Sequence, residues 1–163
     1  MRDVRCHQTM PSVRLVAAAA LGSLLGVAPF LRCAESAWHQ LDAGAFAFSA
    51  PLDVVAKPLD GVAIDSYVGE YRGTSLDVMF DYGLYSSPLG GYTTSHTEKI
   101  NGREARLVQY DDSPKGSFRF EHFRAVYFAT TGEPKMRLTM FVSCRDDHAC
   151  HIAEAMFRTI RFR

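Results

Sequence analysis

The chain has 163 residues and a mass of 18.1 kDa, which suits one compact domain and is too short for two ordinary ones. Apolar residues make up 47% and charged residues 22%, so the composition supports a buried core and excludes an intrinsically disordered chain. Eighteen basic residues balance eighteen acidic ones, which argues against a nucleic-acid-binding protein, because such proteins carry a basic excess.

The N-terminal residues have the pattern of an export signal. An uncharged apolar run over residues 15–31 follows Arg14, as in a secretory signal peptide. The run falls slightly short of the roughly 18 to 20 apolar residues that cross a bilayer, which disfavours a permanent membrane span. We predict a signal peptide over residues 1–33, with Met10 as an alternative start of translation.

Cys33 stands at the end of this leader and raises the question of lipidation. A bacterial lipoprotein site has a small residue before the cysteine, where this chain has Arg32, so the sequence disfavours a lipid anchor at Cys33. Residues 1–33 hold four arginines and one aspartate, a charge of +3, which leaves −3 on the rest. We expect a mildly acidic single domain over residues 34–163, exported to the bacterial periplasm or the extracellular space, without a stable membrane span after cleavage.

The residues after the leader predict strands joined by turns. The clearest local signal is Asn101-Gly102, because both residues favour the positive φ of a type I′ turn and therefore a hairpin. A loop is expected between Pro51 and Pro58, and further loops over residues 86–91 and 111–116. Alternation of apolar and polar residues predicts strands over residues 43–51, 62–71, 76–81, 92–100, 103–110, 118–130 and 135–144.

A helix is expected near the C-terminus. Asp146 and Asp147 place carboxylates at the positive end of the helix dipole. One apolar stripe follows at helical spacing, formed by Ala149, Ile152, Ala153, Met156 and Phe157. Residues 159–163 can return as a short last strand. The predicted fold class is α+β, a mostly antiparallel sheet with the C-terminal helix packed on it, behind the signal peptide.

Cys144 and Cys150 are the two cysteines of the expected mature domain. In an exported domain such a pair is interpreted first as a disulfide. The alternative is a metal site, because His148 and His151 lie beside the two sulfurs. Structural zinc sites normally have a second, distant cysteine pair, which this chain lacks, so the sequence favours the disulfide and predicts no cofactor.

The sequence shows no complete catalytic motif. A nucleophile elbow, a P-loop, a dinucleotide-binding glycine motif and H-E-x-x-H are all missing, so no catalytic residue is assigned and a hydrolase is disfavoured. The richest polar segment holds Asp77, Asp81, Tyr82 and Tyr85. Asp81, Tyr82 and Tyr85, together with Tyr92, form a candidate binding surface for a polar ligand or a cation. In the competing structural interpretation, Asp81 accepts backbone hydrogen bonds at a strand end while the tyrosines cover the sheet.

The order of these elements resembles the Mog1/PsbP-like fold over residues 43–163. The resemblance rests on the opening strand, the hairpin at Asn101-Gly102, the long strand pair after it, and a helix that returns to Ile160-x-Phe162. It implies an assembly factor, adaptor or chaperone-like binding module without a shared catalytic motif, so no functional residue is carried over.

Two functions follow as expectations. The first is an exported interaction or assembly module that binds an unknown protein of the cell envelope. The alternative is a periplasmic protein that binds a small molecule or a metal through Asp81, Tyr85 and the His148/His151 pair.

Overall fold

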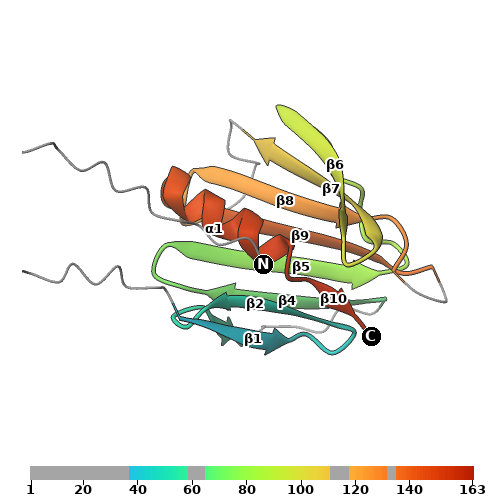
Figure 1. The fold of residues 1–163 in the computed structure, drawn as a ribbon, viewed down its shortest axis with the longest axis horizontal. Coiled ribbons are helices and arrows are strands. Elements are labelled where there is room, and N and C mark those ends of the chain that lie inside the picture. Colours follow the sequence, from blue (N-terminus) through green and yellow to red (C-terminus); the bar gives the residue numbers. More distant parts are fainter. Residues whose placement is uncertain (1–36, 59–64, 111–117, 132–134) are drawn as a thin grey trace, which may run out of the picture. The chain divides into compact units, whose positions relative to one another are not determined.

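Ten strands and one helix make up the part of the chain that the structure describes (Figure 1). The computed structural model describes residues 37–58, 65–110, 118–131 and 135–163. The elements are β1 (Trp38–Asp42), β2 (Phe46–Pro51), β3 (Val55–Lys57), β4 (Ser66–Arg72), β5 (Leu76–Gly83), β6 (Thr94–Ile100), β7 (Arg103–Tyr110), β8 (His122–Phe128), β9 (Arg137–Cys144), α1 (Asp147–Phe157) and β10 (Arg161–Phe162). The predicted leader over residues 1–33, including Met10 and Cys33, and the predicted loop over 111–116 lie outside the described residues.

The strands form two antiparallel sheets. The small sheet has the order β1–β2–β10, and the large sheet has the order β3–β4–β5–β9–β8–β7–β6. Every strand pair among the described residues is antiparallel, and α1 packs against β8, β9 and β2. The predicted α+β class, with an antiparallel sheet and a C-terminal helix packed on it, is confirmed.

Hairpins build one half of the large sheet, as the sequence predicts. Asn101 and Gly102 have φ values of 48° and 83°, and they connect Ile100 to its partner Arg103. The Asn101 side chain also donates to the carbonyl of Ile160 at 2.6 Å, which ties this turn to the chain after the helix. The long-range pairing of β5 with β9, from Leu76 opposite Cys144 to Gly83 opposite Arg137, joins these hairpins to β3 and β4.

The beginning of the domain differs from the prediction. The expected first strand over 43–51 is β2, which begins only at Phe46, because Gly44, with a φ of 80°, lies in the turn that connects it to β1, an additional strand before the predicted range. The expected loop between Pro51 and Pro58 contains β3, which pairs with β4. Both missed strands are short, mostly exposed edge strands, so they lack the apolar alternation that identifies a strand in a sequence.

The main core lies between the large sheet, the small sheet and α1. Phe46 of β2 contacts Phe80 of β5 edge-on, with ring centroids 4.9 Å apart. Of the predicted helical stripe, Ala149, Ala153, Met156 and Phe157 are buried in this core, while Ile152 is partly buried against it. Fully burying each large side chain contributes roughly 1.5–3 kcal/mol, so these contacts hold the helix on the sheet.

The helix begins where the sequence predicts. Asp146 is the N-cap residue, and its carboxylate accepts a hydrogen bond from the amide of Ala149 at 2.8 Å. Asp147 lies in the first turn, where its negative charge faces the positive end of the helix dipole. Figure 1 shows α1 crossing the large sheet before the chain returns through β10 to the small sheet.

Candidate functional site

The outward face of the large sheet, opposite the face that packs against α1, has one buried part and one exposed part. Over β7 and β8, Leu89 packs against a second buried cluster, formed by Val108, Tyr110, Phe123 and Ala125. Over β4 and β5, the outward side chains of Val68 and Met79 are 38% and 42% exposed. The second half of this face therefore presents apolar side chains to solvent.

The exposed half contains a groove over β4, β5 and β9. One hollow of about 300 Å³ is lined by Val68, Glu70, Met79, Asp81 and Phe141, together with the backbone of Gly69 and part of Phe80. We call these five side chains the outer groove. Cross-strand pairing explains their proximity, because Met79 lies opposite Glu70 on β4 and opposite Phe141 on β9.

A second hollow of about 420 Å³ continues from the outer groove and shares Glu70, Met79 and Phe141 with it. Its charged groups are paired. Arg119 donates two hydrogen bonds to Asp77, at 3.1 and 2.6 Å, and a third to the carbonyl of Gly73. The remaining carboxylate, Glu70, accepts from Lys57 at 2.6 Å. Tyr71 also lines this hollow, and burial raises the pKa of its phenol.

Asp81 differs from these paired carboxylates. Its Oδ1 is buried, and no described residue donates a hydrogen bond to it. Its cross-strand neighbours are Val68 and Thr139, neither of which is charged. The competing structural interpretation, in which backbone amides satisfy Asp81, does not hold for Oδ1. A buried carboxylate oxygen without a donor is costly, and this makes Asp81 a candidate ligand-binding group.

The structure separates the four predicted surface residues. Asp81 lines the outer groove, whereas Tyr82 points to the opposite face, is 7% exposed, and accepts a hydrogen bond from the Thr131 hydroxyl. Tyr85 is 76% exposed just beyond β5. Tyr92 packs against the second cluster, with the Arg106 guanidinium 5.6 Å from its ring centroid. Tyr82 is therefore corrected to a core residue, because successive side chains of a strand alternate between faces.

Sequence reasoning missed the apolar members of the groove. Met79 and Phe141 face outward on β5 and β9. Other outward residues of the same two strands, Asp77 and Thr139, are polar. The outward-facing positions of these strands are otherwise polar, so an apolar side chain at such a position is the sequence signal that could have indicated the groove. The pairing of β5 with β9, which brings Met79 and Phe141 together, is not readable from either strand alone.

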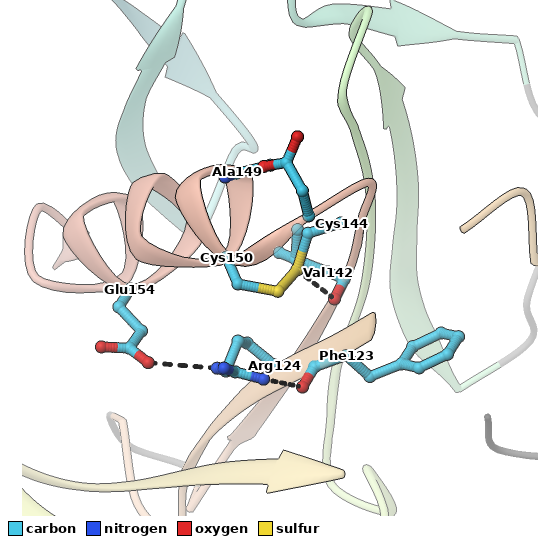
Figure 2. Close-up of a disulfide and its surroundings, with 8 residues drawn as sticks. Phe123, Arg124, Val142, Cys144, Ala149, Cys150 and Glu154 are labelled. Atoms are coloured by element: carbon cyan, nitrogen blue, oxygen red, sulfur yellow. Dashed lines mark hydrogen bonds and ion pairs between the residues drawn. A yellow bond between two sulfur atoms is a disulfide. The ribbon is translucent and has the colours of Figure 1, made fainter. Parts of the chain in front are cut away.

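The predicted disulfide is present. Cys144, at the end of β9, is bonded to Cys150 in the first part of α1, with a Cα–Cα distance of 5.3 Å, and both residues are buried. Figure 2 shows this bond together with Arg124 and Glu154, whose side chains form an ion pair at 3.1 Å. The bond and the ion pair both connect α1 to the large sheet.

The disulfide takes the two sulfurs that the alternative metal site would need. With Cys144 and Cys150 bonded to each other, His148 and His151 remain as exposed residues of α1. Within residues 37–58, 65–110, 118–131 and 135–163, no group of three or more His, Cys, Asp or Glu side chains is arranged to hold a metal ion. Across the same ranges, no helix is long and apolar enough to span a membrane.

Comparison with known proteins identifies the fold. No protein-family model and no curated protein matches the sequence. The solution structure of cyanobacterial PsbP (CyanoP) from Synechocystis sp. PCC 6803 is similar in fold, with a TM-score of 0.54 and 11% sequence identity. The match covers 88% of this chain and 99% of that chain. The predicted PsbP-like fold is confirmed.

Proposed function

We propose that this chain is an exported interaction or assembly module, a single domain over residues 34–163 that binds a protein of the cell envelope through the outer groove. The observation that supports this proposal is the outer groove and its lining residues. Its floor, Met79 and Phe141, lies on two central strands of the large sheet, so the binding surface is rigid. Phe141 also packs against the second cluster, whereas Val68 and Met79 are exposed, and exposed apolar side chains beside an orphaned carboxylate are typical of a recognition surface.

Export is supported by two independent features. The leader pattern of residues 1–33 is that of a signal peptide. The buried bond between Cys144 and Cys150 suits an oxidising compartment, because structural disulfides are rare in reducing cytosol.

The comparison with CyanoP adds an analogy at the level of fold. The sequence resemblance to Mog1/PsbP-like proteins implies an assembly factor, adaptor or chaperone-like module, and the shared fold is consistent with such a role. A fold hosts many functions, so the groove and not the fold has to carry the assignment.

Site-specific photocrosslinking tests the proposed surface. A benzophenone amino acid replaces Met79 in the outer groove, and in a control variant it replaces Tyr67, which is 66% exposed on β4 but points to the other face. We expect discrete adducts with envelope proteins from Met79 and none of the same mass from Tyr67. The added substitution Val68→Asp should abolish them, because it places a charge in the apolar wall. Equal adducts from both positions would contradict the proposal.

A further inference from the structure

The orphaned carboxylate identifies the chemistry of the partner. We propose that the outer groove binds a polypeptide segment that presents a lysine or arginine side chain to Asp81 and apolar side chains to Met79 and Phe141. This inference rests on the proposed function. The ligand class is thus a basic residue between apolar neighbours.

Charge pairing singles out Asp81 among the acidic residues of the two hollows. Glu70 is paired with Lys57, and Asp77 is paired with Arg119 and, at 3.5 Å, with Arg72. No ion pair among the described residues includes Asp81, and its Oδ1 lacks a donor. The unsatisfied charge in the groove is therefore negative and lies at one defined position.

The hydroxyl groups near Asp81 donate their hydrogen bonds to backbone carbonyls and not to its carboxylate. The Ser86 hydroxyl donates to the backbone carbonyl of Asp81 at 3.0 Å and lies 2.8 Å from the Thr139 hydroxyl. Thr139 in turn donates to the carbonyl of Ser87 at 2.7 Å. These bonds fix the segment beside the groove, and no described residue donates to Asp81 Oδ1, so we expect a partner to supply the donor.

The surroundings of Asp81 strengthen such a contact. Val68, Met79 and Phe141 lower the local dielectric, and an ion pair is stronger there than in water. The aliphatic stem of lysine or arginine packs on apolar surface while its charged end reaches a carboxylate. The Phe141 ring can also contact a cation through its face. The charge of −3 on residues 34–163 attracts a basic partner at longer range.

A cation on the same outward face of β9 is Arg137. It lies opposite Gly83, two residues along β9 from Thr139, and faces outward in the same register as Asp81. Arg137 forms no ion pair with Asp81 in the structure. Because Arg137 is a cation in the same outward register of β9, it provides a matched control.

Blocked peptides serve as probes. Acetyl-Gly-Leu-Arg-Leu-Gly-amide is titrated into the purified protein and compared with the same peptide carrying Gln or Glu in place of Arg. Binding is followed by backbone amide NMR shifts on β4, β5 and β9. We expect the Arg peptide to shift these resonances and to bind about tenfold tighter than the Gln peptide, with the Glu peptide weakest.

Two variants separate charge recognition from folding. Asp81→Asn keeps the shape of the side chain and should remove the preference for Arg over Gln, while thermal unfolding shows an intact fold. Arg137→Gln removes a charge from the same face and should keep that preference. Equal binding of the three peptides, or an unchanged preference in Asp81→Asn, would overturn the inference. Butylamine binding as tightly as the Arg peptide would also overturn it, because the groove would then be a small-amine site.

The crosslinking experiment distinguishes this inference from the proposed function. If adducts at Met79 persist in Asp81→Asn and the peptides show no charge preference, the groove docks a partner but the cation assignment is wrong. If Met79 gives no adducts and no peptide binds, the proposed function fails as well.

Discussion

Two aspartates on β5 show how strongly the environment of a residue depends on its neighbours. Asp77 and Asp81 point to the same face of the same strand, four residues apart. Asp77 holds the Arg119 guanidinium through two hydrogen bonds, whereas Asp81 Oδ1 has no donor among the described residues. The sequence singled out Asp81 by its tyrosine neighbours, but its unpaired state follows from contacts with β4, β9 and segment 84–93.

Gly69 on β4 lies directly under the ring of Phe80, so a substitution there tests how tightly this part of the core is packed. A methyl group added at Gly69 would lie 2.6 Å from Cζ of Phe80, whose ring covers this glycine. We expect Gly69→Ala to lower the free energy of unfolding by about 1–3 kcal/mol, because the buried ring has to move. Urea denaturation measures the loss.

Gly90→Ala is the matched control for that change. Gly90 is exposed, and nothing lies within 4 Å of an added methyl group. Its effect should stay within about 0.5 kcal/mol. Equal effects of the two substitutions would show that the Phe80 ring does not constrain Gly69.

At the scale of elements, the sequence predicted most boundaries that depend on local signals. The Asn101-Gly102 turn and the Asp146 cap lie where expected, because each is set by residues a few positions apart. The strand β7 matches its predicted range in full. The missed elements, β1 and β3, are short edge strands whose pairing with β2 and β4 is not encoded by an apolar alternation of their own.

The disulfide links two of these elements and gives a prediction about stability. The double substitution Cys144→Ala with Cys150→Ala should lower the free energy of unfolding by roughly 2 kcal/mol, because the bond restricts the unfolded chain over a short loop. Urea denaturation of the variant and the oxidised wild type measures the difference.

Two further observations check the bond directly. The oxidised protein should be lighter by two hydrogen atoms than the reduced one in intact mass spectrometry. Reduction of the wild type should reproduce most of the stability loss. An oxidised mass equal to the reduced mass, or a double variant as stable as the wild type, would contradict a stabilising disulfide.

At the scale of the whole molecule, the charge of the chain divides into unlike parts. The zero net charge of the full sequence is the sum of +3 on residues 1–33 and −3 on residues 34–163. If the leader is removed on export, the functioning protein is acidic, which suits the basic partner proposed for the outer groove.

Export can be tested on the full chain. Expressed in a bacterium with a secretory pathway, the protein should appear in the periplasm or medium, and N-terminal sequencing should place the new start close to Ala34. A control variant with Leu24→Arg and Leu25→Arg interrupts the apolar run and should remain unprocessed inside the cell, because charges prevent recognition of the signal. Processing of both chains, or of neither, would contradict the predicted leader.

The sequence by itself determined what depends on local pattern. Alternation, turn residues and the helical stripe were sufficient for the α+β class, the hairpin at Asn101-Gly102 and the helix, and the cysteine pair was sufficient to favour a disulfide. Only the tertiary structure decided which residues from distant parts of the sequence become neighbours on the outward face of the sheet. The outer groove exists because β5 pairs with β9, residues that are about 60 positions apart in the sequence. That pairing is set by burial of the other face against α1 and the small sheet, so a local pattern cannot specify it.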